Sequence, residues 1–154
     1  MKIEFTREEY KCLLDMIYIA EWILNAHKVG DDPRTKEYGK LEQKVYSYAK
    51  EMGFEDLIEY VVDHGQYFPT KVYEDAGSAT KFVDEFEDET FWDELINRLA
   101  ERDLIKQLGG TENLSKLSFE ERIERILELE KKYSSEFEKN GLDNVSIVSN
   151  KRKK

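Results

Sequence analysis

The sequence predicts an all-α fold, a single-domain bundle of about six helices around a central N-terminal helix. A chain of 154 residues is about the size of one domain. Apolar residues make up 40% of the chain, enough for a core although 38% of the residues are charged. They recur at helical spacing, and only two prolines interrupt long stretches rich in Glu, Lys, Leu and Arg. We expect a helical domain over residues 1–141 and a tail with a basic end over residues 142–154.

The first predicted helix runs from about Arg7 to Lys28 and begins at a capping box formed by Thr6 and Glu9. At about 100° per residue, one side of this helix is polar and the other is apolar over about half of the circumference. The apolar side consists of Cys12, Leu13, Met16, Ile17, Ile19, Ala20, Ile23 and Leu24. An apolar arc of this width needs several neighbouring helices to cover it, so we expect this helix at the centre of the bundle. We also expect Cys12 to lie in the core and the last helix to pack along the first.

The remaining helices are placed by their start and stop signals. Asp32 and Pro33 start a second helix that Gly53 stops, and a capping box of Ser118 and Glu121 starts the last one. Between them we expect helices over residues 55–64, from Ser78 and from Thr90, an ordered loop over 66–77, and a last helix ending at Asn140 and Gly141. Residues 145–148 of the tail have a strand-like pattern.

Negative charge is concentrated in the middle of the chain. The net charge is -10, but residues 51–94 alone contain 14 acidic residues and only two basic ones, Lys71 and Lys81. The same stretch contains nine of the 19 aromatic residues. An acidic surface with exposed aromatic side chains is typical of a site that docks a basic protein, because opposite charges steer association and aromatic residues anchor it.

The first function hypothesis is therefore a small acidic interaction or regulatory protein that contacts a basic partner through residues 51–94. The residues expected to bind the partner are Asp84, Glu85, Glu87, Asp88, Glu89 and Trp92. A DNA-mimicking inhibitor is a sharper version of this hypothesis. The competing interpretation is that these acids are the solvated side of a helix whose Phe82 and Phe86 lie in the core.

A carboxylate-based hydrolase that uses Mg²⁺ or Mn²⁺ is the alternative function, with Asp84, Glu85 and Asp88 as candidate ligands. The known phosphate-loop, dinucleotide-binding, nucleophile-elbow and zinc motifs are missing, so we expect no cofactor. The spacing of Glu120, Glu121 and Glu124 is similar to the first magnesium motif of the all-α nucleoside triphosphate pyrophosphohydrolases. No Glu-x-x-Asp follows it, so the chain is not assigned to that family.

Four polar residues fall where the helical pattern predicts core: His27, Arg102, Asp103 and Glu130. Buried charges are usually paired, so we expect these residues to pair with one another or to lie in frayed turns. The functional alternative is a polar cavity in which Glu130 or Asp103 acts as a base beside His27.

The sequence also argues against several environments and partners. Its acidity disfavours direct binding of nucleic acid or of an anionic membrane. No apolar stretch approaches the roughly 20 residues of a membrane span, and the charged N-terminus lacks the plan of a signal peptide. A single cysteine closes no internal disulfide. We therefore expect a cytoplasmic protein.

Overall fold

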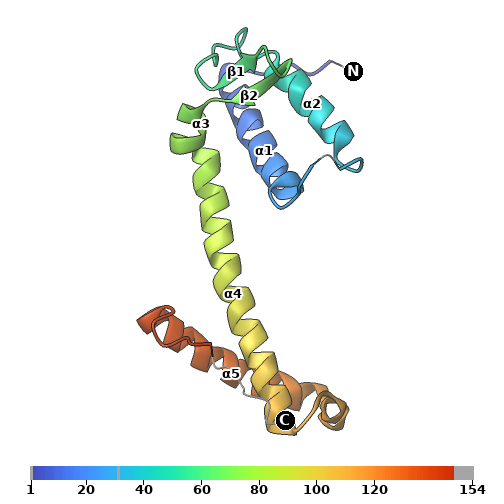
Figure 1. Ribbon diagram of the computed structural model, residues 1–154, viewed down its shortest axis with the longest axis vertical. Helices are drawn as coiled ribbons and strands as arrows, with labels where there is room; N and C mark the ends of the chain where they lie inside the picture. The colour runs from blue at the N-terminus through green and yellow to red at the C-terminus, as the bar shows by residue number, and fades with distance from the viewer. Residues whose placement is uncertain (1, 31, 148–154) are drawn as a thin grey trace. The chain divides into compact units, whose positions relative to one another are not determined.

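A computed structural model describes residues 2–30 and 32–147 of the chain. It is mostly helical, at 65%, and contains six helices and one small two-stranded sheet, so the predicted helical character is confirmed and the sheet was not expected. The helices are α1 (Arg7–Asn25), α2 (Lys36–Tyr46), α3 (Lys71–Ala76), α4 (Ser78–Leu108), the 3-10 helix η1 (Thr111–Lys116) and α5 (Phe119–Asn140) (Figure 1).

The chain divides into two compact units, a first unit of Met1–Glu87 and a second unit of Asp88–Lys154, and the division falls within α4. Each unit has its own core. The first core consists of Tyr10, Leu14, Tyr46, Ala49, Phe54, Ile58 and Tyr73. The second consists of Ala100, Leu104 and Leu129, with Leu108, Leu114, Leu117 and Ile126 packed against it. The core residues of α5 therefore lie with those of α4 and η1.

Helix α1 begins at the predicted capping box. The Glu9 backbone N–H donates to Thr6 Oγ1 at 3.2 Å, and the Thr6 N–H donates to Glu9 Oε2 at 2.8 Å. The buried side of the helix differs from the predicted one, because Tyr10 and Leu14 are buried whereas Met16 and Ile23 are exposed. Cys12 is also exposed, so its assignment to the core was wrong.

Asp15 explains why the inward side of α1 includes polar positions. Its carboxylate accepts hydrogen bonds from Lys11 Nζ at 2.7 Å, from Tyr73 Oη at 2.7 Å and from Ser78 Oγ at 2.9 Å. These donors belong to α1, α3 and the first residue of α4. Although partial burial opposes ionisation, the three donors together lower the pKa of Asp15. A carboxylate held in this way can face the packed side of a helix without an unpaired charge.

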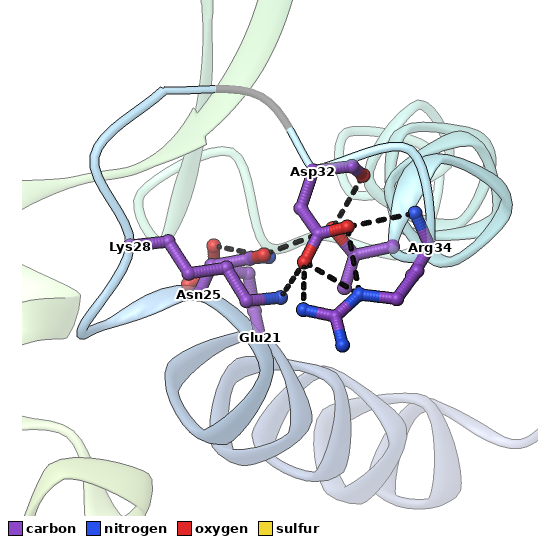
Figure 2. A network of polar contacts seen from close by, with 6 residues as sticks. Glu21, Asn25, Lys28, Asp32 and Arg34 are labelled. Atoms are coloured by element: carbon purple, nitrogen blue, oxygen red, sulfur yellow. Dashed lines mark hydrogen bonds and ion pairs between the residues drawn. The ribbon is translucent and has the colours of Figure 1, made fainter.

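The connection between α1 and α2 is held by a polar network around Asp32. Arg34 donates to the Asp32 carboxylate through its backbone N–H at 2.9 Å and its guanidinium at 2.7 Å, and Lys28 Nζ lies 2.9 Å from the same carboxylate. Figure 2 shows both cations directed at this carboxylate, whose pKa they hold well below its usual range. Thr35 Oγ1 donates to Asn25 Oδ1 at 3.0 Å, which ties the connection back to α1.

Helix α2 is shorter than predicted at both ends. It begins at Lys36 rather than next to Pro33, and residues 33–35 form a turn in which the Thr35 N–H donates to the Asp32 carbonyl at 3.0 Å. It ends at Tyr46, and turns occupy the residues from there to Gly53, where φ is +76°.

Residues 55–64 do not form the expected helix. They contain strand β1 (Ile58–Val61), which pairs antiparallel with β2 (Gln66–Pro69). Tyr60 lies opposite Tyr67, with ring centroids 4.9 Å apart. The side chain of Gln43 accepts from the Tyr67 N–H at 2.7 Å and donates to the Tyr67 carbonyl at 2.9 Å, so α2 satisfies backbone groups of the hairpin. The expected loop over residues 66–77 instead contains β2 and α3.

Helix α4 is continuous where two helices were expected. It begins at Ser78 as predicted, but Thr90 starts no new helix. Phe82 and Phe86 are each 59% exposed and Phe91 is 49% exposed, so the interpretation of Phe82 and Phe86 as core residues was wrong. The acidic part of α4 therefore carries exposed aromatic rings.

Helix α5 begins and ends where the sequence predicts. Ser118 and Glu121 form the capping box, and Gly141 follows the last helical residue with φ of +53°. Its predicted apolar stripe is only partly buried, because Phe137 is buried whereas Phe119 and Ile123 are exposed. Residues 145–147 are not a strand, and Val148 and the basic residues 151–154 lie outside the described residues. Within the described ranges, no helix has both the length and the apolar character needed to cross a membrane.

The surroundings of Glu42 in the first unit predict that stability depends on pH. Partial burial, assisted by repulsion from Glu21 on α1, raises the pKa of Glu42 on α2 to about 7. The native state therefore holds this proton more tightly than the unfolded state, so its contribution to stability is present at low pH and is lost as pH rises toward 7. In the parent, the free energy of unfolding should fall between about pH 5 and pH 8 as Glu42 loses its proton. We expect this fall to be smaller by about 1–3 kcal/mol in the Glu42→Gln variant, which has no proton to lose.

Urea denaturation at several pH values measures this effect. A Trp92→Phe background leaves Trp22 as the sole tryptophan, so that fluorescence reports on the first unit. Glu8→Gln, which neutralises an exposed acid on α1, is the matched control. Parallel pH profiles for Glu42→Gln and the parent would contradict the prediction.

Candidate binding site

All 14 acidic side chains of residues 51–94 are exposed. Among the residues that the structure describes, only Glu94 of this set forms an ion pair, with Arg98 at 2.8 Å. The remaining acids of this stretch form no ion pair with a described basic residue. The acidic side chains of residues 51–94 therefore lie at the surface in both units.

The six residues predicted to bind a partner all lie on α4, and the structure places them in two groups. Asp84, Glu85 and Glu87 belong to the first unit, where the Trp22 indole N–H donates to Glu87 Oε1 at 2.9 Å. The other three belong to the second unit, where they line one cavity; they are Asp88, Glu89 and Trp92.

This cavity, named here the Trp92 pocket, has a volume of about 460 Å³. Helix α4 contributes five of its lining residues and α5 contributes three. They are Asp88, Glu89, Trp92, Asp93, Ile96, Ser134, Phe137 and Glu138. The α4 residues follow the repeat of one helix face, so one turn after another faces α5.

Two aromatic rings, Phe91 and Phe137, pack against Trp92. Its ring centroid lies 5.5 Å from that of Phe137 at an interplanar angle of 41°, and 5.0 Å from that of Phe91 at 73°. Phe137 is buried and also stacks with Tyr133, at 6.0 Å. Trp92 itself is half-buried, so part of its surface stays accessible in the pocket.

Carboxylates surround these rings on both helices. Asp88, Glu89 and Asp93 come from α4, and Glu138, which accepts from Ser134 Oγ at 3.0 Å, comes from α5. None of the described residues that line the pocket is basic. A negatively charged rim over an aromatic surface favours a cationic ligand, because carboxylates and π faces both attract positive charge.

The sequence missed the α5 side of this pocket. Phe137 was assigned to an apolar stripe, and nothing in the sequence connected it or Glu138 with Trp92, which lies 45 residues earlier. The sequence did contain one pattern that could have indicated this side of the pocket. At helical spacing, Ser134, Phe137 and Glu138 share one side of α5. Identifying that side as a wall of the pocket requires the packing of α4 against α5.

The predicted buried polar cluster is not buried. Arg102 donates to Asp103 at 2.9 Å and to Tyr133 Oη at 3.1 Å, and Tyr133 Oη donates to the same aspartate, so these three side chains form a network at the surface. Hydrogen bonds from Arg102 and Tyr133 lower the pKa of Asp103 to about 2. Glu130 is only half-buried, and His27 is exposed and belongs to the first unit.

This geometry gives no support to a base placed beside a histidine in a polar cavity. Asp103 is held ionised by its donors, and its carboxylate is already engaged by them. The expectation that Arg102 and Asp103 pair with each other agrees with the contacts, whereas the burial assigned to Arg102 and His27 was wrong.

The described part of the chain contains no group of three or more His, Cys, Asp or Glu side chains that could hold a metal ion. This applies to the candidate ligands Asp84, Glu85 and Asp88, which are exposed on α4. Comparison of the chain with protein-family models, with curated proteins and with solved structures gave no match.

Proposed function

We propose that this protein is a small acidic interaction protein that docks a basic protein partner through residues 51–94. The observation that carries the proposal is that every acid of this stretch is exposed and that, among the described residues, only Glu94 has a basic partner. Unpaired surface charge of one sign raises the rate of association with an oppositely charged protein.

Exposed aromatic rings beside these acids support a docking role. Phe82 and Phe86 lie next to Asp84 and Glu85 on α4 in the first unit. Aromatic residues are enriched among the side chains that dominate the energy of interfaces, whereas charges at the rim mainly set the rate and the partner. The two features together suit a basic partner with apolar contacts.

The probe for this proposal is a fluorescent basic peptide of about 12 residues in which Arg and Lys alternate with Gly and Ser. Fluorescence anisotropy is measured with the full chain at several salt concentrations. Because salt screens exposed charges, we expect the affinity to fall about tenfold or more between about 20 mM and 300 mM NaCl. Affinity that does not change with ionic strength would overturn the proposal.

A charge-neutralised variant locates the surface. We expect the combined substitutions Glu74→Gln, Asp75→Asn, Asp84→Asn and Glu85→Gln to weaken peptide binding about fivefold or more at low salt. All four acids are exposed and none lines the Trp92 pocket. The matched control removes the same charge elsewhere, through Glu101→Gln, Glu120→Gln, Glu124→Gln and Glu128→Gln, which are also exposed. Equal weakening by both variants would show an effect of net charge only and contradict the assigned surface.

A further inference from the structure

We infer that the Trp92 pocket binds an arginine side chain of the basic partner, an inference that rests on the proposed function. The pocket lies wholly within the second unit, between α4 and α5. It would act as an anchor, whereas the acids on the rest of residues 51–94 supply attraction at longer range.

The aromatic side of the pocket suits a flat cation. Trp92 is half-buried, with the Phe91 ring at a steep angle to it and the Phe137 ring tilted against it, so part of its ring surface stays accessible. A cation within about 6 Å of a tryptophan ring centroid is attracted to its π face, and tryptophan is the strongest of the aromatic residues in this contact. A planar guanidinium can stack on the ring and keep its N–H groups free at its edge.

The charged rim suits the same group. Both helices contribute carboxylates to the pocket: Asp88, Glu89 and Asp93 from α4, and Glu138 from α5. None of these four side chains forms an ion pair within the described ranges. A guanidinium presents five N–H donors in a fixed fork, so it can reach carboxylates on two sides while it stacks. A lysine ammonium is a compact and strongly hydrated charge that stacks less well, so we infer arginine as the preferred ligand.

Other ligand classes fit the pocket less well. Four carboxylates repel a phosphate or any other anion. A metal ion needs a set of converging ligands, and the described residues contain no such group of three. Ile96 and the two rings provide apolar surface that a hydrated metal ion would not use.

Nuclear magnetic resonance on the ¹⁵N-labelled full chain tests the pocket directly. The chain has two tryptophans, Trp22 in the first unit and Trp92 in the second, so two indole N–H signals report on the two units separately. Trp22→Phe assigns them. The probes are N-acetyl-arginine amide and its neutral isostere N-acetyl-citrulline amide. We expect the arginine probe to shift the Trp92 signal, with saturation in the millimolar range, and to leave the Trp22 signal unchanged.

Variants then separate the two halves of the site. We expect Trp92→Leu to remove the aromatic contact and Asp93→Asn with Glu138→Gln to remove one carboxylate from each wall. Each should weaken the arginine probe about fivefold or more, and Asp84→Asn with Glu85→Gln, outside the pocket, should change it less than twofold. The carboxylate variant keeps the test valid if Trp92→Leu destabilises the second unit, because it leaves the contact between the Trp92 and Phe137 rings in place.

Three results would overturn the inference. The first is an unchanged Trp92 signal, and the second is an equal response to the citrulline probe. The third is a shift of the Trp92 signal when Lys151, Arg152, Lys153 and Lys154 are replaced with glutamine without any ligand, which would assign the pocket to this chain's own end.

Failure of this inference can be told apart from failure of the proposed function. A basic peptide that binds with the expected dependence on salt while the Trp92 signal stays unchanged would leave the proposed docking surface standing and remove the pocket. If instead the arginine probe binds the Trp92 pocket but the basic peptide shows no salt-dependent binding, the pocket stands and the proposed docking surface is removed.

Discussion

Leu104→Ala is expected to destabilise the second unit by about 2–5 kcal/mol and to leave the first unit nearly unaffected. Leu104 is fully buried in a small core whose other buried members, among the residues that the structure describes, are Ala100 and Leu129. Removing its side chain takes away apolar contacts with these residues and with the partly buried side chains packed against them, and leaves a cavity. Because the first unit has a separate core, the damage should stay local.

Amide hydrogen exchange measured by mass spectrometry on the full chain follows both units in one experiment. We expect protection to fall over the second half of α4 and over α5, and to stay unchanged over α1. Leu14→Ala, at an equally buried position of the first core, should give the opposite pattern. Leu127→Ala is the control, since it removes the same atoms from an exposed position of α5. Loss of protection in both units for either buried variant would contradict the two-core arrangement.

Asp15→Ala is expected to destabilise the first unit by about 2–3 kcal/mol. Its carboxylate accepts from Lys11, Tyr73 and Ser78, and the substitution leaves the Tyr73 hydroxyl of a buried side chain without its acceptor. The donors hold the pKa of Asp15 below its ordinary value, so this contribution is present at neutral pH and is lost as pH falls through that lowered pKa.

Urea denaturation followed at Trp22, in the Trp92→Phe background, measures this loss near pH 7 and again at low pH. Glu8→Ala removes an exposed acid from the same helix and should change stability by less than about 0.5 kcal/mol. A cycle with Tyr73→Phe separates the hydroxyl contact from the others, because the two substitutions should not add. Strict additivity, or equal effects of Asp15→Ala and Glu8→Ala, would show that Asp15 does not join α1 to α3.

Local signals in the sequence predicted the ends of several elements well. Both capping boxes, at Thr6 and Ser118, start helices, and Gly141 follows the last residue of α5. A cap depends on residues within about one turn of each other, so no distant contact is needed to identify it. The hairpin was missed because Ile58 and Val61 also fit a helical spacing, and what stabilises the strands is pairing with β2 and the contact of Gln43 with Tyr67.

Helical wheels predicted less well which sides of the helices are buried. They placed Phe82 and Phe86 in a core and gave α1 the wrong buried side, because an apolar stripe shows which side can be buried and not whether a partner element reaches it. On α1, the hydrogen bonds of Asp15 with Tyr73 and Ser78 turn a partly polar side inward.

The sequence by itself determined where the negative charge of this protein is concentrated and that Trp92 lies among those acids, because both are properties of residues close together in the chain. Only the tertiary structure decided that Trp92, Asp88, Glu89 and Asp93 face Phe137 and Glu138 across one pocket. That pairing brings together residues about 45 positions apart, and it depends on how the side chains of α4 and α5 pack, which no local pattern encodes.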